Sequence, residues 1–457
     1  MSRLVVISNR VSSPGKRAVQ AGGLAIAMQA ALSEHGGLWM GWSGKSSGAR
    51  EPGKPVFREE GRITYALTDL SRPDIDEYYT GFANSVLWPL CHYRLDLTDY
   101  ARKDMAGYFR VNRFFAQQLA PHLRPDDLVW VQDYHLIPMG SELRHMGVKN
   151  RLGFFLHIPW PPPDLFFALP VHETIVRRLT AYDLVGFQTQ FDADNFASCL
   201  EREGIGRALE DGWFEAYGHL FRVGVFPIGI DTAGFAQLAQ NAVRSGSVRK
   251  IEESFRDRDL IVGVDRLDYS KGLTHKIEAF DKFIAANPAS QGRATLLQIT
   301  PKSRSEVLQY ATLQRQVAEF AGRVNGRHGT PDWVPIRYVN RSIGQATLAG
   351  IYRAARVGLV TPIRDGMNLV AKEYVAAQRS EDPGVLVLSR FAGAARELDG
   401  AILVNPYDIE AVANAIAQAL SMSMETRRQR WNQMMQHLLK HDISKWCRDF
   451  LEALRAP

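Results

Sequence analysis

The chain has 457 residues, 46% of them apolar and 23% charged, and its 55 lysines and arginines against 49 acidic residues give a net charge of +6. This balance is ordinary for a folded globular protein and excludes a disordered, collagen-like or membrane-embedded chain. A chain of this length exceeds one hydrophobic core, so we expect two or three domains.

The start of the chain and its cysteines indicate the compartment. Met-Ser-Arg is followed by only four apolar residues, Leu4–Ile7, which are too few for a secretory signal and are typical of a first strand. Cys91, Cys199 and Cys447 lie far apart without a Cys-x-x-Cys pair, which argues against a disulfide framework and a cysteine-based zinc site. No apolar run approaches the ~20 residues that span a bilayer. We therefore expect a cytoplasmic protein without a membrane partner.

The positive charges are scattered along the chain. The densest group, Arg427–Arg430, stands among helix-forming residues and is typical of a solvated helix face. Nucleic-acid binding requires a basic patch or stripe, so we expect no nucleic-acid partner. A mild excess of cations suits an enzyme whose substrates are phosphorylated anions.

In chain order, short β-branched or aromatic runs alternate with longer amphipathic stretches. The predicted strands are Leu4–Ser8, Leu38–Trp42, Leu128–Gln132, Gly153–His157, Leu184–Gln188, Val223–Pro227, Leu260–Val264, Thr295–Ile299, Ile336–Val339, Gly358–Thr361, Val385–Leu388 and Ala401–Val404. The predicted helices are Gly23–Ser33, His172–Tyr182, Gly272–Asn287, Val307–Arg323, Ile343–Ala355 and Ile409–Ser421. Near-continuous apolar strands that alternate with helices are typical of parallel sheets covered on both faces, so the fold class is α/β.

About a dozen strands exceed what one twisted sheet usually holds, and two Rossmann-like domains are the expected arrangement. Asp231–Arg249 lacks a strand pattern and carries glycines and hydroxyl residues, which places the join near Asp231–Phe235. We expect one domain over residues 1–232, a second over 233–440 and a C-terminal helix over 441–457, after a break at His441-Asp442.

Ligands of open α/β sheets bind beyond the carboxyl ends of the strands, which makes polar residues after strands candidates. Arg10 follows the first strand and precedes Gly22-Gly23, a pair that opens a predicted helix. Such a pair lets backbone N–H groups approach a phosphate, although alone it equally fits a plain turn. The Gly-x-Gly-x-x-Gly pattern is absent there, so a dinucleotide-dependent dehydrogenase is disfavoured.

Two further candidates follow strands in the first half. Asp133 comes directly after Leu128–Gln132, where its carboxylate suits sugar hydroxyls or the cap of the next helix. His157 ends the strand Gly153–His157 before a proline-rich loop. In isolation this histidine also fits a core position.

In the second half, Arg266 and Lys271 stand on one loop after Leu260–Val264, and Gly272 opens the next helix. Two fixed cations beside a helix N-terminus predict a site for a diphosphate, with a solvated basic loop as the alternative. Arg304 follows the next strand in the same way.

Two carboxylates follow the strand Gly358–Thr361. Asp365 lies in the loop, and Glu373 comes eight residues later on a predicted helix that starts near Leu369. A carboxylate accepts two hydroxyl donors at once, which suits the diols of ribose or a hexose.

Longer blocks of sequence identify a family. They are Ser-Asn-Arg at 8–10, Ala-Gly-Gly-Leu at 21–24, Gly-Trp-Ser-Gly at 41–44, and the stretches 77–94, 131–136, 154–162, 264–272 and 361–376. They resemble the trehalose-6-phosphate synthase family, from residue 1 to the C-terminal helices. The resemblance implies a retaining glycosyltransferase of the GT-B type: two Rossmann-like domains facing across a central cleft, with the C-terminal helix crossing back to the first. It also implies transfer of glucose from UDP-glucose to glucose 6-phosphate, giving trehalose 6-phosphate and UDP, the first step of trehalose biosynthesis.

The resemblance implies roles for single residues. The implied acceptor ligands are Arg10, Tyr79, Trp88 and Arg304 for the phosphate, with Trp42 and Asp133 for the sugar. The implied donor ligands are Gly22, Gly23, Arg266, Lys271, Ile343, Leu369, Val370 and Glu373, and the implied catalytic group is Arg266, Lys271, Asp365, His157 and Asp133. Ile343, near the nucleotide base, stands where family members commonly carry an aromatic residue, which leaves the preference for uridine open.

The implied mechanism is a front-face transfer, in which the departing phosphate oxygen takes the proton of the acceptor hydroxyl. The substrates are small molecules, no cofactor or metal is expected, and the resemblance implies a homodimer or homotetramer. Three alternatives stay open: a sibling transferase with another phosphorylated acceptor, such as glycerol 3-phosphate, or another nucleotide-glucose donor; a catalytically silent sensor of sugar phosphate; and a glycoside hydrolase with paired carboxylates. The predicted phosphate sites argue against the hydrolase, which needs none.

Overall fold

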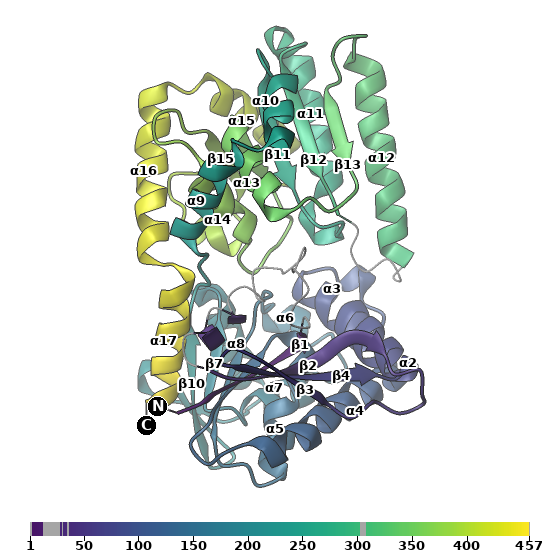
Figure 1. Ribbon diagram of the computed structural model, residues 1–457. Helices are drawn as coiled ribbons and strands as arrows, with labels where there is room; N and C mark the ends of the chain where they lie inside the picture. Colours follow the sequence, from purple (N-terminus) through teal and green to yellow (C-terminus); the bar gives the residue numbers. More distant parts are fainter. Residues whose placement is uncertain (1, 12–27, 30, 34–35, 302–307, 457) are drawn as a thin grey trace. The chain divides into compact units, whose positions relative to one another are not determined.

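The computed structural model describes residues 2–11, 28, 29, 31–33, 36–301 and 308–456. It divides the chain into two compact units, each an α/β structure built on its own sheet (Figure 1). Unit 1 comprises Met1–Pro227 and Ser444–Pro457, and unit 2 comprises Ile228–Ile443. None of the helices in the described ranges has the combined length and apolarity that crossing a membrane requires.

Unit 1 contains a ten-stranded sheet in the order β3-β4-β2-β1-β5-β6-β7-β10-β9-β8. The strands are β1 (Leu4–Arg10), β2 (Gly37–Ser46), β3 (Val56–Glu60), β4 (Ile63–Leu70), β5 (Leu128–Gln132), β6 (Arg151–Phe155), β7 (Leu184–Phe187), β8 (Arg207–Ala208), β9 (Trp213–Ala216) and β10 (His219–Val225). The strands from β4 to β10 in this order are parallel, whereas β3 pairs antiparallel with β4 at one edge, and β9 pairs antiparallel with both β10 and β8 at the other. Among the parallel strands, β1, β2 and β4 follow one another towards one edge of the sheet, and β5, β6, β7 and β10 follow one another towards the other edge. The strand order therefore reverses between β1 and β5.

The helices of unit 1 connect the strands and cover the sheet. They are α2 (Arg72–Asp74), α3 (Trp88–Cys91), α4 (Arg102–Leu119), α5 (Met139–His145), α6 (Pro163–Phe166), α7 (His172–Leu179), α8 (Gln190–Arg202) and α17 (Ile443–Arg455). Between α2 and α3 runs η1 (Ile75–Leu87), a π-helix. Such helices are rare and occur mostly as single turns, frequently at functional sites.

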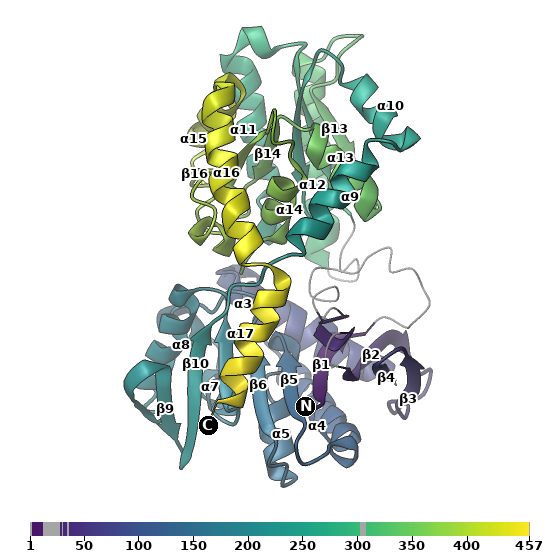
Figure 2. The same ribbon diagram turned by 60° about the vertical axis from the view of Figure 1, so that its left-hand side comes forward.

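The C-terminal helix α17 completes the core of unit 1. Its buried residues recur with helical spacing and include Trp446 and Phe450. The Phe450 ring stacks on Trp130 of β5 at 4.5 Å, and Trp446 meets the Phe155 ring edge-on at 5.1 Å. Figure 2 shows α17 lying over the strands of unit 1.

Unit 2 contains a six-stranded, fully parallel sheet in the order β13-β12-β11-β14-β15-β16. The strands are β11 (Asp259–Val264), β12 (Ala294–Ile299), β13 (Ile336–Val339), β14 (Val357–Val360), β15 (Val385–Ser389) and β16 (Ile402–Val404). Numbered within the unit, this order is 3-2-1-4-5-6, the Rossmann order, with its reversal between β11 and β14. Apolar residues dominate the central strands β12, β11, β14 and β15, which are buried on both faces, whereas the edge strands β13 and β16 are partly exposed.

The helices of unit 2 begin at side-chain caps in several cases, for example at Asp231, Asp408 and Ser423. They are α9 (Thr232–Ala242), α10 (Gly246–Ser254), α11 (Leu273–Ala286), α12 (Leu308–His328), α13 (Gln345–Ala354), α14 (Leu369–Ala377), α15 (Ile409–Ser421) and α16 (Met424–Lys440).

All twelve strands predicted from the sequence are present, with ends shifted by a few residues, and the predicted helix break falls between α16 and α17. The sequence prediction missed β3, β4, β8 and β9. Every side chain of β3 is exposed, so it lacks the apolar run that marks a buried strand. The predicted helix Gly23–Ser33 lies largely outside the described residues. The predicted domain limits and the placement of substrates on them stay predictions.

Candidate active-site residues

In unit 1 the candidate residues gather where the strand order reverses. Arg10 is the last residue of β1, and Asp133 follows β5, its neighbour in the sheet. The ends of two strands that part at a reversal leave a crevice in which ligands of α/β proteins bind. His157 follows β6, the next strand along.

A cation and two aromatic rings form the first group. The Arg10 guanidinium lies 5.1 Å from the centre of the Trp42 ring, and Trp42 meets Tyr79 edge-on at 5.3 Å. Gly44, with φ +84°, leaves room for this guanidinium, because a Cβ there would come within 2.2 Å of an Arg10 nitrogen. Arg10 itself is exposed, so its charge is available to an anion. The sequence thus predicted three residues that the fold brings together.

A continuous series of rings extends from this group. Tyr79, on η1, stacks on His135 with 5.9 Å between the ring centres. The His135 ring centre in turn lies 3.9 Å from that of Tyr134. Tyr134 lies 5.7 Å from Trp88, which is buried. All three aromatic residues predicted for the acceptor therefore belong to one wall, Trp88 at the far end from Arg10.

Asp133 occupies an unusual backbone conformation, with φ +74°. Its N–H donates to the Phe155 carbonyl at 2.8 Å, and its Oδ1 accepts the N–H of His157 at 3.1 Å. These two bonds join the loops after β5 and β6. A non-glycine residue with positive φ costs energy and occurs preferentially at functional sites.

The His157 imidazole is held by Gln132, the buried last residue of β5. Nε2–H donates to Gln132 Oε1 at 2.8 Å, which leaves Nδ1 as an acceptor. Burial among Phe155 and Trp446 lowers the pKa of His157 to about 3, so the ring is neutral at pH 7. A neutral ring suits a hydroxyl-binding role better than a phosphate-binding role.

In unit 2 the loops after β11 and β14 meet at the reversal of strand order. The Ser270 carbonyl accepts the N–H of Ile363 at 2.8 Å. Gly272, with φ +62°, lies directly against the loop that follows β14. A Cβ at this position would come within 2.9 Å of the Thr361 carbonyl oxygen. Glycine at this position lets the Lys271 loop reach the Asp365 loop.

This juxtaposition creates a buried ion pair between two predicted site residues. Lys271 Nζ lies 2.5 Å from Asp365 Oδ2, and both side chains are at most 15% exposed. Asn368 Nδ2 donates to the same carboxylate oxygen at 2.9 Å, while its Oδ1 caps α14 by accepting the N–H of Ala371 at 3.3 Å. The group combines an ammonium, a carboxylate and a helix N-terminus, which together suit a phosphorylated sugar.

Arg266 lies on the same loop and is exposed. Beneath it, Asp265 forms a fully buried ion pair with Lys276 and also accepts a hydrogen bond from Gln298 Nε2 at 3.2 Å. A buried and satisfied pair fixes the backbone on which Arg266 stands.

The remaining donor candidates lie around α14 and β13. Leu369 and Val370 are the first residues of α14, so their N–H groups point out of the helix N-terminus. Glu373 lies one turn further along, and burial raises its pKa to about 7. Among the described residues it makes no hydrogen bond or ion pair with Lys271 or Asp365. Ile343 is half-buried in the connection from β13 to α13.

Gly22, Gly23 and Arg304 lie outside the described residues, so their predicted roles stay predictions. Two residues that the sequence analysis did not select, Gln132 and Asn368, orient predicted site residues. An asparagine directly before a helix is a capping signal, and it could have indicated Asn368. Gln132 gave no such signal, because a polar residue at a strand end is common.

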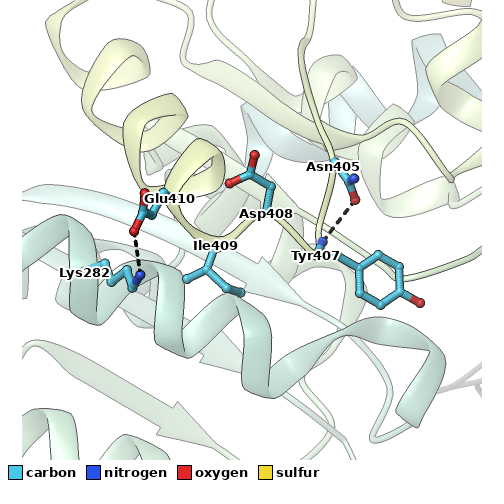
Figure 3. A pocket seen from close by; sticks show the side chains of 6 residues that line it. All are labelled: Lys282, Asn405, Tyr407, Asp408, Ile409 and Glu410. Carbon is cyan, nitrogen blue, oxygen red and sulfur yellow. Dashed lines mark hydrogen bonds and ion pairs between the residues drawn. The ribbon is translucent and has the colours of Figure 1, made fainter.

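The described surface of unit 2 also has an open depression of about 500 Å³ (Figure 3). It is lined by Lys282, Asn405, Tyr407, Asp408, Ile409 and Glu410. Lys282 pairs with Glu410 at 3.0 Å, and no predicted site residue lines this depression. Within the described ranges, no group of three or more His, Cys, Asp or Glu side chains is arranged to hold a metal ion.

Comparison with known proteins gives a consistent result. The chain is 65% identical to a trehalose-6-phosphate synthase of Sinorhizobium fredii, over all of this chain and 99% of that one. A Burkholderia xenovorans UDP-forming α,α-trehalose-phosphate synthase, solved in complex with glucose-6-phosphate, is 45% identical with a TM-score of 0.96, each chain covered completely. An Escherichia coli structure bound with UDP-2-fluoro glucose is 43% identical with a TM-score of 0.95, again with complete coverage. The fold is therefore the GT-B fold. The model of glycosyltransferase family 20 matches residues 4–456, and the chain belongs to this family.

Proposed function

We propose that the chain transfers glucose, with retention of configuration, from UDP-glucose to glucose 6-phosphate, which yields α,α-trehalose 6-phosphate and UDP. The relatives support this activity, since one binds the acceptor and another a fluorinated analogue of the donor. The observation in this chain that carries the proposal is the group of Lys271, Asp365 and Asn368 at the N-terminus of α14. It offers one cation for a diphosphate beside one carboxylate for a sugar.

The two units take different substrates in this proposal. Unit 1 receives glucose 6-phosphate: Arg10, Tyr79 and Trp88 bind the phosphate, and Trp42 packs against the sugar ring. Asp133 accepts a sugar hydroxyl. Aromatic faces bind the apolar faces of pyranose rings, while carboxylates and cations orient the hydroxyls and the phosphate.

Unit 2 receives UDP-glucose. Arg266, Lys271 and the N–H groups of Leu369 and Val370 bind the diphosphate, and Glu373 binds the ribose. Asp365 binds the transferred glucose, and His157, a residue of unit 1, is assigned to the same sugar. A neutral His157 accepts a hydrogen bond from a sugar hydroxyl through Nδ1, because Nε2–H donates to Gln132.

The proposed reaction is a front-face displacement. The C1–O bond to the β-phosphate of UDP breaks, and a new C1–O bond forms to the 1-hydroxyl of glucose 6-phosphate on the same face. The hydroxyl proton passes to the departing phosphate oxygen, so charge and atoms balance without a covalent enzyme intermediate. Catalysis then depends on alignment of the two sugars and on stabilisation of the charge on UDP.

Arg266 and Lys271 supply that stabilisation. Removal of one donor to a developing oxyanion commonly costs about 3–4 kcal/mol of transition-state stabilisation, and two cations would account for much of the rate. A glycoside hydrolase has no use for this pair, which disfavours that alternative.

A UDP-release assay with a panel of acceptors tests the proposal. We expect turnover with glucose 6-phosphate and little with glycerol 3-phosphate or free glucose, and NMR of the product should show the α,α-linkage. Turnover with glycerol 3-phosphate instead would identify a sibling transferase. Sugar-phosphate binding without turnover would identify a sensor. Replacing UDP-glucose by ADP-glucose or GDP-glucose, with NMR detection of the trehalose 6-phosphate formed, tests the base preference near Ile343.

Further features stay predictions from the sequence. We propose a cytoplasmic homodimer or homotetramer that needs no cofactor. Light scattering on the purified protein measures the oligomeric state, and activity after dialysis against EDTA tests the metal requirement.

A further inference from the structure

Lys372 lies in the first turn of α14 and is completely buried, at 0% exposure. Its Nζ donates to the carbonyl of Ile228 at 2.7 Å and lies 2.6 Å from Glu397 Oε2. Glu397 Oε1 accepts a hydrogen bond from His437 Nε2 of α16 at 3.1 Å. A single lysine thus joins three separate parts of unit 2.

Burial of an ammonium is expensive unless its charge and all its donors are satisfied. Desolvation lowers the pKa of Lys372, while the Glu397 carboxylate opposes that shift. A leucine or methionine would fill the same space in an apolar helix face at lower cost. The position therefore requires an explanation beyond packing.

The partner of Lys372 indicates what that explanation is. Ile228 is the first residue of unit 2, and residues 228–232 form the segment by which the chain enters this unit. Residues 441–443 form the exit segment at its other end. The two segments are bonded to each other, because the Ile443 N–H donates to the Ile230 carbonyl at 3.0 Å.

Helix α16, which leads into the exit segment, is also hydrogen-bonded to the entry segment. Thr232 Oγ1 donates to the Leu438 carbonyl of α16 at 2.9 Å. A Cβ at Gly229 would come within 2.4 Å of the His441 carbonyl, so the two backbones lie in direct contact. Lys372 connects this paired entry and exit to the helix whose N-terminus faces the proposed donor.

We propose that Lys372 is a positioning residue for the donor: its ammonium fixes the first turn of α14 against the entry and exit segments of unit 2. The inference rests on the proposed function, because it takes the N–H groups of Leu369 and Val370 as donor ligands. These groups lie in the same helical turn as Lys372, so a shift of that turn misplaces them. By linkage, donor binding at α14 also stabilises the entry segment.

A cycle of three variants separates positioning from stability. Lys372→Met removes the bond to Ile228 and leaves Glu397 with only His437. Glu397→Gln removes the charge partner but keeps the bond from Lys372 to Ile228. The double variant removes both charges, so no unpaired ion stays buried and its unfolding temperature should recover towards wild type.

We expect the KM for UDP-glucose to rise about tenfold in Lys372→Met and in the double variant, the scale of one lost hydrogen bond to a charged group. The KM for glucose 6-phosphate should stay within about twofold of wild type in both. Glu397→Gln should lose stability but keep a near wild-type KM for UDP-glucose. A double variant with wild-type KM, or an equal rise in Glu397→Gln, would overturn the proposal.

Hydrogen exchange on the wild-type protein gives an independent test, should the Lys372 variants not fold. UDP should protect residues 228–232 together with 369–377, and protection confined to 369–377 would refute the inference. This measurement uses UDP binding alone. A protein that binds UDP without turnover would contradict the proposed function, while its exchange pattern would still test whether the donor site on α14 is coupled to the entry segment; no protection by UDP in either segment would overturn the inference as well.

Discussion

Lys271 and Asp365 neutralise each other in an ion pair, although the proposal assigns them to different parts of the donor. The pair keeps two charges of low exposure satisfied until a substrate replaces each partner. In the proposed complex, the diphosphate binds the ammonium and sugar hydroxyls donate to the carboxylate. On this proposal, a ligand that carries both groups compensates for the separation of the pair, because it satisfies both charges.

This arrangement predicts the effect of Lys271→Ala. Turnover should fall by on the order of a hundredfold, because one donor to the departing phosphate is lost. The matched control is Lys282→Ala, since Lys282 follows on α11 but pairs with Glu410 at the open depression, away from the predicted site. Folded Lys271→Ala protein with the turnover of this control would contradict the assignment.

Glu373 predicts a pH dependence of donor binding. Burial raises its pKa from 4.5 to about 7, so its contribution to stability is full below pH 4.5 and is lost as the pH rises through 7. Ribose hydroxyls donate better to the ionised form, and UDP binding should therefore release a proton. The affinity for UDP should rise by roughly tenfold between pH 6 and 8 through this group.

Calorimetry at pH 6, 7 and 8 measures that rise. The terminal phosphate of UDP titrates in the same range, so the comparison is with Glu373→Gln, in which only the phosphate contributes. The variant should show the smaller slope. Equal slopes in both proteins would exclude Glu373 from the ribose site.

At the scale of single elements, Asn368 shows how one residue serves both a helix and a site. It has φ +77°, caps α14 and donates to Asp365. Asparagine tolerates this left-handed conformation better than most residues. The first turn of α14 and the Asp365 carboxylate are thereby fixed by the same side chain.

Two substitutions of Asn368 separate these contributions. Asn368→Ala loses the cap and strains the backbone, so stability should fall by about 1–2 kcal/mol. Asn368→Gly relieves the strain and should recover much of the stability in chemical denaturation. Both variants should have lower kcat/KM for UDP-glucose, because Asp365 loses the hydrogen bond from Asn368 in each. Recovery of activity in Asn368→Gly would show that only the backbone conformation matters.

The elements that could be predicted from the sequence are those whose pattern is local. The strands of the second unit are short branched runs between helices, and their alternation alone predicts a parallel sheet. β4, in contrast, is paired on both sides but reads Ile-Thr-Tyr-Ala-Leu-Thr-Asp-Leu, with polar residues that weaken the pattern. β3 needs β4 as its antiparallel partner, and such pairing has no local signature.

The same limit applies to the candidate site. Arg10, Lys271 and Asp365 could be selected from the sequence because they stand at or after the ends of predicted strands. The family motifs then added the other candidate site residues. The Lys271–Asp365 pair joins residues 94 apart, and the bond between Lys372 and Ile228 spans 144. Contacts at these separations depend on strand order, which single-sequence patterns do not contain.

At the scale of the whole molecule, both units place their candidate residues at the reversal of strand order. β1 and β5 do so in unit 1, and β11 and β14 in unit 2.

Unit 1 also depends on the last residues of the chain. Phe450 of α17 lies against Gly153 and Gly186, where a Cβ would come within 2.8 Å of its ring in each case. The two glycines leave the sheet open to this ring.

Phe450→Ala should therefore destabilise unit 1 by about 3–5 kcal/mol, the range for a fully buried phenylalanine. Hydrogen exchange should report lost protection in β5, β6 and β7, while β11 and β14 of unit 2 keep theirs. Phe191→Ala is the matched control, because Phe191 belongs to unit 1 but is 46% exposed, so its substitution should cost little stability.

Gly153→Ala should destabilise the wild-type protein, where the new methyl group collides with the Phe450 ring. It should destabilise the Phe450→Ala protein much less, because that space is then empty. If the two substitutions were simply additive, or if protection fell equally in β11, the proposed dependence of unit 1 on α17 would be wrong.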